Sequence, residues 1–261
     1  MDSPIKWVGG KRNLRKKLIS IMPEHMQYTE VFGGAAWVLL DKPKSKLEIF
    51  NDINGDLINF YRVIQSKLKC ELLINKINML PKSREIFDSF KTKIESETNE
   101  INKALMFYYL LKLTFGGDLI NPRYTIPNDG RKNINYDKIP EEFWALHERL
   151  KDVYIENKDF EYIITKYDRK DGNVLFYLDP PYLDTFGYQT KKFTYENYKN
   201  MKLLLNNING KFIITCNDKF ELRELFKDNY IIDNQVHYSL SGSSDACKEY
   251  GELIITNYKI A

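Results

Sequence analysis

The strongest constraint on the fold is an alternation of short apolar strands and helices at both ends of the chain. Residues 28–32 (YTEVF) are typical of a strand that runs into a glycine turn and a helix. Residues 46–54 (KLEIFNDIN) predict a second strand, again followed by a helical segment. Strand patterns return after residue 152 as DVYIENKDF, VLFYL, KFIITC, YIIDNQV and ELIITNYKI. This alternation predicts an α/β protein with a layered sheet.

The middle of the chain has a different sequence pattern. Residues 66–154 are dominated by long charged helical patterns, followed by a stretch rich in turn residues and cations at 116–140. We therefore predict one sheet domain built from residues 1–65 and 155–261. Residues 66–154 would form an inserted, mainly helical domain with a loop-rich tip.

The segment 173–186 (NVLFYLDPPYLDTF) combines a buried strand with an unusual ending. Its apolar run is typical of a strand covered on both faces. Asp179 puts a carboxylate at the end of that strand, and Pro180 and Pro181 cannot continue a hydrogen-bonded ladder. Tyr182 then adds an aromatic face. One interpretation is a plain proline turn; the other is a stiff platform that presents an acceptor, a carbonyl and a ring.

A second candidate site follows the first predicted strand. Gly33 and Gly34 stand between strand and helix, where backbone can approach a ligand closely. Asp52 follows at the end of the next strand, and an acid at this distance typically holds ribose hydroxyls. The full GxGxxG pattern of dinucleotide sites is absent, which favours a nucleoside ligand without phosphate, such as S-adenosylmethionine.

Composition excludes several other classes of protein. The 261 residues include three cysteines and three histidines, all scattered, so we predict neither a disulfide framework nor a metal site. The 39 basic residues nearly balance 36 acidic ones, so net charge does not decide the partner. The sequence has no apolar stretch long enough for a membrane span. We expect a soluble, intracellular protein.

Four segments taken together resemble one family: KWVGGK (6–11), EVFGGAA (30–36), NDIN (51–54) and DPPY (179–182). They are similar, in this order, to the Dam-type DNA adenine-N6 methyltransferases of the D12 class, including their phage relatives. Residues 251–258 (GELIITNY) resemble that family's final strand. Ala36 departs from the pattern, because many relatives have glycine there. The resemblance implies a Rossmann-like methyltransferase sheet with an inserted, mainly helical DNA-recognition domain.

The resemblance also implies roles for individual residues. S-adenosylmethionine would be the methyl donor, and no metal would be needed. Asp179, Pro180 and Tyr182 would be catalytic: they would grip the exocyclic amine of a flipped adenine and stack its ring. The residues expected to contact the cofactor are Trp7, Lys11, Phe32, Gly34, Asp52 and Asp179.

Contacts with double-stranded DNA are expected from both parts of the chain. Lys6 corresponds to a lysine that lies near the recognised bases in relatives. In the inserted segment, Asn121 and Arg123 are candidates for reading bases, and Arg131 and Lys132 for binding phosphates. The basic run at 11–17 predicts a helix over 11–22, whose cations either contact phosphate or simply face solvent. The loop only loosely follows the recognition hairpin of GATC-specific members, so the target sequence stays open.

Other activities fit parts of this pattern. Cytosine-N4 transfer is one, although related enzymes carry serine in place of Asp179. Methylation of RNA or of a protein amide, and a catalytically inactive DNA-binding relative, are the others. We expect a monomer or a weak dimer on DNA.

Overall fold

The computed structural model of the protein describes residues 1–7, 9–128, 130, 132–184, 193–237 and 249–260. Its centre is a seven-stranded sheet with the order β3-β2-β1-β4-β5-β7-β6, in which β7 runs antiparallel to both of its neighbours and the other pairings are parallel. The strands are β1 (Gln27–Glu30), β2 (Leu47–Asn51), β3 (Val153–Glu156), β4 (Val174–Leu178), β5 (Lys211–Asn217), β6 (Tyr230–His237) and β7 (Glu249–Thr256).

The helices fall into two groups along the chain. Five of them precede or follow strands of the sheet: α1 (Arg15–Ser20), α2 (Trp37–Asp41), α8 (Phe160–Tyr167), α9 (Tyr195–Leu205) and α10 (Phe220–Leu225). The others are consecutive between β2 and β3: α3 (Gly55–Gln65), α4 (Lys67–Asn78), α5 (Arg84–Lys93), α6 (Glu100–Leu113) and α7 (Ile139–Leu150).

Strand β4 is a continuous apolar run because helices cover the sheet on both of its faces. All five of its residues are buried. Val174, Phe176 and Leu178 share one hydrophobic cluster with α8, α9 and α10, and the alternate residues Leu175 and Tyr177 share another with α1 and α2. Successive side chains of a strand point to opposite faces, so a strand with helices on both sides needs a continuous apolar run.

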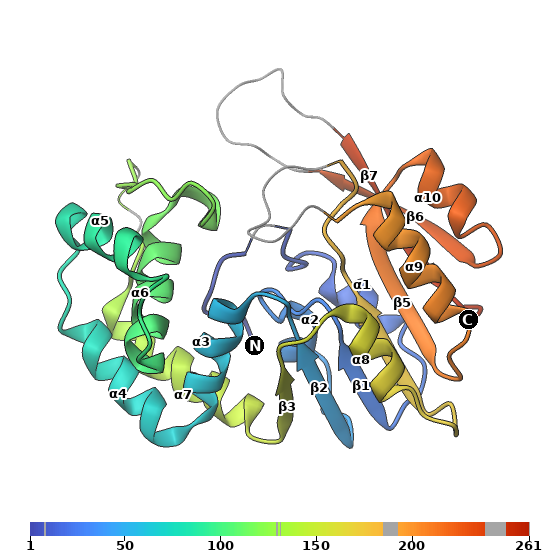
Figure 1. Cartoon of the computed structure of the whole chain (residues 1–261), viewed down its shortest axis with the longest axis horizontal. Helices are drawn as coiled ribbons and strands as arrows, with labels where there is room; N and C mark the ends of the chain where they lie inside the picture. The colour runs from blue at the N-terminus through green and yellow to red at the C-terminus, as the bar shows by residue number, and fades with distance from the viewer. Residues whose placement is uncertain (8, 129, 131, 185–192, 238–248, 261) are drawn as a thin grey trace.

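The helices α4 to α7 gather beside the β3 edge of the sheet, on the left of Figure 1. Helix α6 is buried along most of its length, as expected for a helix that is apolar all round. Aromatic rings pack between these helices: Phe60 of α3 lies 5.9 Å from Tyr108 of α6 and 5.7 Å from Phe143 of α7, centroid to centroid. The division into domains at residues 66 and 154 stays a prediction.

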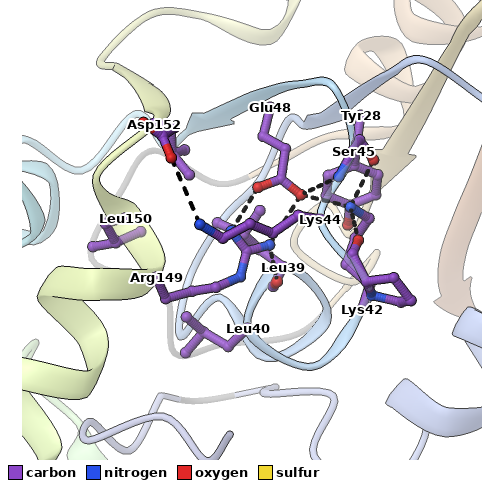
Figure 2. Close-up of polar contacts among 12 residues, drawn as sticks. Tyr28, Leu39, Leu40, Lys42, Lys44, Ser45, Glu48, Arg149, Leu150 and Asp152 are labelled. Atoms are coloured by element: carbon purple, nitrogen blue, oxygen red, sulfur yellow. Dashed lines mark hydrogen bonds and ion pairs between the residues drawn. The ribbon is translucent and has the colours of Figure 1, made fainter.

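A buried ion-pair network ties α7 to the sheet (Figure 2). The Arg149 guanidinium contacts the Glu48 carboxylate of β2 at 2.5 Å and donates to the Leu39 carbonyl at 2.6 Å. Lys42 approaches the same carboxylate at 2.6 Å, so the acid is balanced by two cations. Together these contacts lower the pKa of Glu48 although burial alone would raise it. The network therefore holds the last of the inserted helices against β2.

The predicted Rossmann-like α/β fold is confirmed, with one local correction. The basic segment forms a helix only over Arg15–Ser20, because Lys11 turns its side chain into the protein instead of continuing a solvent-facing helix. Within the described ranges, no helix has the length and apolarity to cross a membrane.

Candidate active site

A cavity of about 620 Å³ lies at the carboxyl ends of β1, β2 and β4. This edge of a parallel sheet is where α/β proteins bind ligands, and the volume is within the range of small-molecule sites. The residues predicted to contact a cofactor all line it: Trp7, Lys11, Phe32, Gly34, Asp52 and Asp179.

The glycine turn after β1 is required by its neighbours as well as by the cavity. A side chain at Gly33 would begin 2.3 Å from the Phe50 ring, and one at Gly34 would begin 2.9 Å from the Trp7 indole. Gly34 also has a φ of +47°, which L side chains rarely adopt. Ala36, the residue that departs from the family pattern, has a left-handed φ of +57°, where glycine fits without strain.

Asp52 is held by backbone groups close to it. Its carboxylate accepts from Gly34 N at 2.9 Å and from Asn54 N at 2.9 Å. Burial raises the pKa of this carboxyl, and the hydrogen bonds from Asn54 and Gly34 oppose the shift. Asn157 donates to the Asp52 carbonyl at 2.8 Å and so fixes the same loop from β3. The result is an acceptor with a fixed direction at the wall of the cavity.

Aromatic rings make up another wall. Phe32 lies 5.9 Å from Phe160 and 5.6 Å from Phe193 between ring centroids. All three line the cavity. Phe160 and Phe193 were not predicted from the sequence, because neither belongs to a motif and each is far from Phe32 along the chain.

The Asp179 carboxylate lies at the end of β4 and contacts side chains from other elements. Its Oδ1 is 2.7 Å from Lys11 Nζ and accepts from the Thr215 hydroxyl at 2.7 Å. Burial raises its pKa, and the Lys11 ammonium and the Thr215 hydroxyl act in the opposite direction. Thr215 was missed by sequence analysis, although a threonine inside the apolar run of β5 is a detectable signal.

The backbone after Asp179 is fixed at several points. Pro180 and Pro181 restrict it by their rings. The Tyr198 hydroxyl donates to the Pro181 carbonyl at 3.2 Å. Leu183 N donates to the Asn217 side chain at 3.0 Å, and that side chain donates back to the Leu183 carbonyl at 2.9 Å. The interpretation as a stiff platform therefore agrees with these contacts.

Tyr182 lies in a cluster with Lys11 and Glu252. The Lys11 Nζ donates to the tyrosine hydroxyl at 3.0 Å and lies over the ring, 4.7 Å from its centroid. The hydroxyl itself donates to the Glu252 carboxylate. Glu252, on β7, was not predicted as a site residue; its only sequence signal is an acid directly before the apolar run of residues 253–255.

The residues predicted to bind DNA lie at the surface wherever the structure describes them. Lys6, Asn121, Arg123 and Lys132 are exposed, and Arg131 lies outside the described residues. Lys132 Nζ is 3.7 Å from the Asp137 carboxylate.

Part of the loop-rich stretch at residues 116–140 approaches the cavity. A side chain on Gly117 would begin 2.7 Å from the Lys6 carbonyl, so the loop passes directly over the Lys6 backbone. A second cleft, of about 670 Å³, is lined by Ile120 and Pro122 and shares Ile53 and Asn54 with the first cavity. The loop and the candidate active site thus form one continuous surface.

Two cations of the basic run are engaged within the protein. Arg12 pairs with Asp2 at 2.9 Å, and Arg15 pairs with Asp2 at 2.9 Å and with Asp41 at 3.0 Å. These pairs favour a structural role for the two arginines. Within the part of the chain that the structure describes, no three His, Cys, Asp or Glu side chains are grouped as metal ligands.

Comparison with known proteins places this chain in a family. A sequence profile of the D12 class N6 adenine-specific DNA methyltransferases matches residues 7–240. The type II methyltransferase M1.LlaDCHI of Lactococcus lactis is 25% identical, over 97% of this chain and 94% of its own length. The DNA adenine methylase of Escherichia coli K12 is 23% identical, over 96% of this chain and 93% of its own.

A phage protein is similar over part of its length. The DNA N-6-adenine-methyltransferase of Escherichia phage P1 is 26% identical, over 87% of this chain and 31% of its own length. The profile match spans every strand of the described sheet except β7, and the helices between β2 and β3. The chain therefore belongs to the D12 class of N6 adenine-specific DNA methyltransferases.

Proposed function

We propose that this protein transfers a methyl group from S-adenosylmethionine to N6 of an adenine extruded from double-stranded DNA. The observation that carries the proposal is the cavity at the strand ends, where Asp179 of the DPPY segment lies beside the five other residues expected to contact the cofactor. Membership of the adenine-specific family supports the same reaction.

The residues around the cavity fit the proposed cofactor. Asp52 offers a carboxylate to ribose hydroxyls, and its backbone hydrogen bonds already fix its direction. Phe32 and Trp7 supply apolar surface for an adenine ring, and the glycine turn lets backbone come close. When bound, S-adenosylmethionine would supply an electrophilic methyl group on its sulfonium.

Asp179 and Pro180 would orient the amine of the target base. The lone pair of an adenine N6 is delocalised into the ring, so the amine is a poor nucleophile in the plane of the base. Hydrogen bonds from its two N–H groups to the Asp179 carboxylate and the Pro180 carbonyl would favour a tetrahedral nitrogen with an available lone pair. Because the described contacts of Asp179 use Oδ1, we assign Oδ2 to the amine. Such preorganised acceptors supply much of an enzyme's rate.

Tyr182 would stack on the extruded base. Extrusion costs a few kcal/mol, and stacking on an aromatic side chain returns about 1–3 kcal/mol. The Lys11 ammonium covers one face of the ring, so the base would use the opposite face.

The DNA itself would contact the inserted residues 66–154, which we propose as the target-recognition domain. Lys6, Asn121 and Arg123 would lie near bases, and Arg131 and Lys132 near phosphates. The loop is continuous with the active-site surface, which supports this assignment. Phosphate contacts would make binding weaken as salt concentration rises.

The test compares wild type with Asp179→Ala on unmethylated DNA and S-adenosylmethionine. The DNA is digested to nucleosides for mass spectrometry and sequenced for modified positions. We expect N6-methyladenine from wild type, a rate at least about 10²–10³-fold lower from Asp179→Ala, and full activity from the exposed-site control Asp228→Ala.

Other outcomes discriminate the alternatives. N4-methylcytosine as the product would contradict adenine specificity, and transfer to RNA alone would contradict the DNA substrate. DNA binding without any modification would indicate a catalytically inactive relative.

A further inference from the structure

Glu252 is a buried carboxylate at the centre of β7. It lies opposite Asn217 of β5 and Asn234 of β6 in the sheet register, and its side chain is 4% exposed. Burying a charged group is costly unless it is paired and hydrogen-bonded, so its partners explain why an acid is tolerated there.

The partners of Glu252 belong to the proposed active site. Its carboxylate accepts from the Tyr182 hydroxyl and lies 3.3 Å from Lys11 Nζ. Asn234 donates to the other carboxylate oxygen at 3.4 Å. The same Lys11 ammonium contacts Asp179 at 2.7 Å, so one cation is shared between the buried Glu252 and the partly buried Asp179.

The contact with Tyr182 restrains a part of the side chain that the prolines do not reach. Pro180 and Pro181 limit the backbone, but the ring torsion of a tyrosine is broad and soft. A hydrogen bond at the far end of the ring restrains that torsion. A base can stack only on a ring whose plane is already set, so the hydroxyl contact is a positioning contact.

Through its contact with Lys11, Glu252 divides the attraction of one ammonium between two carboxylates, its own and that of Asp179. A cation paired with Asp179 alone would draw electron density from the carboxylate that accepts the target amine. Glu252 competes for the ammonium, and its negative charge opposes the effect of Lys11 on the pKa of Asp179. Asp179 thereby keeps more of its strength as an acceptor.

We propose that Glu252 is a positioning residue for methyl transfer, which holds the Tyr182 ring by its hydroxyl and shares the Lys11 ammonium with Asp179. This inference rests on the proposed function. Glu252 does not line the cavity and acts through the two residues that it holds.

The test measures single-turnover methyl transfer at saturating S-adenosylmethionine and DNA, on a duplex carrying the target mapped with wild type. Glu252→Ala should lower this rate about 10²-fold, with the dissociation constants for cofactor and DNA unchanged within about twofold. Glu252→Gln retains an oxygen that accepts from the hydroxyl, so its rate should recover to within about tenfold of wild type. Glu221→Gln, at an exposed site, is the matched control.

A double-mutant cycle identifies the route. Tyr182→Phe keeps the ring and removes the hydroxyl, so adding Glu252→Ala to it should cost much less than the same change in wild type. Fully additive losses would overturn the part of the inference that concerns Tyr182. An unchanged rate in folded Glu252→Ala, or a loss confined to cofactor affinity, would overturn the whole inference.

Folding and activity controls keep the outcomes separate. If thermal unfolding shows that Glu252→Ala does not fold, the isosteric Glu252→Gln carries the test. A Glu252→Gln variant with less than about a hundredth of wild-type activity would then contradict rescue by the hydroxyl contact. If wild type itself transfers no methyl group, the proposed function fails; an active wild type with an indifferent Glu252 refutes only this inference.

Discussion

Two carboxylates at the same edge of the sheet are held in opposite ways. Asp52 is fixed by backbone N–H groups of Gly34 and Asn54, which lie within 18 residues of it along the chain. Asp179 is fixed by side chains, of which Lys11 is 168 residues away and Thr215 is 36 residues away. The comparison shows that the Asp52 half of the site is held by nearby backbone, whereas the Asp179 half depends on side chains that only the assembled fold brings together.

The largest effect is expected where the long-range half is broken, in Lys11→Met. The substitution leaves Asp179 and Glu252 buried without their shared cation, which should lower the free energy of unfolding by about 3–5 kcal/mol. The loss should grow between pH 5 and pH 8, because burial raises the pKa of Asp179 and the Lys11 ammonium opposes that shift in wild type. Denaturant unfolding at both pH values measures it, and Lys16→Met, at an exposed site in the same run, is the control. A loss equal to that of the control would mean that the cluster contributes little to stability.

Asp52→Ala tests the half of the site that is held by nearby backbone, and we expect it to change cofactor affinity. Removing the acceptor for ribose hydroxyls should raise the dissociation constant for S-adenosylmethionine by about 10–100-fold, which is about 1.4–2.8 kcal/mol. The single-turnover rate at saturating cofactor should stay within about threefold of wild type, since Asp52 does not contact the reacting atoms. Titration calorimetry and single-turnover assays separate the two quantities. An unchanged affinity with a lowered rate would contradict the assignment of Asp52 to the cofactor.

A third acid, Glu30, extends the comparison because it is held by a side chain and by a backbone group. Glu30, at the end of β1, accepts from the Tyr28 hydroxyl at 2.7 Å and from Leu39 N at 2.9 Å. Burial raises its pKa from 4.5 to about 8. Between these values the folded protein holds a proton that the unfolded chain has released, so this group makes stability fall as pH rises.

The variant Glu30→Gln should lose that pH dependence. We expect its stability relative to wild type to rise by about 2 kcal/mol between pH 6.5 and pH 9. This corresponds to about 4–8 °C in the difference of melting temperatures for a chain of this size. Scanning calorimetry at both pH values measures it. A difference that stays constant with pH would show that Glu30 titrates normally in the folded protein.

How much of the site could be predicted follows from the same contrast. The strand–helix alternation, the glycine turn and Asp52 depend on contacts within short segments, so their local patterns carried the prediction. The DPPY segment was recognised by its family motif. Glu252, Phe160 and Phe193 were missed because their roles arise only when distant strands and loops pack together. The helix at the basic run was predicted too long for the same reason, since the buried position of Lys11 is set by Asp179 and Glu252.

The position of β7 has a consequence for how the protein matures during synthesis. This strand is inserted between β5 and β6, and in the described sheet β6 pairs with β7 alone. Because β7 follows β6 along the chain, β6 gains its neighbour in the sheet only when β7 has been made, and the same strand brings Glu252 to Lys11. A nascent chain that has not yet exposed residues 249–256 lacks one acid of the cluster and leaves β6 without a neighbour. The cluster of Lys11, Asp179 and Glu252 would thus be complete only after β7 has left the ribosome.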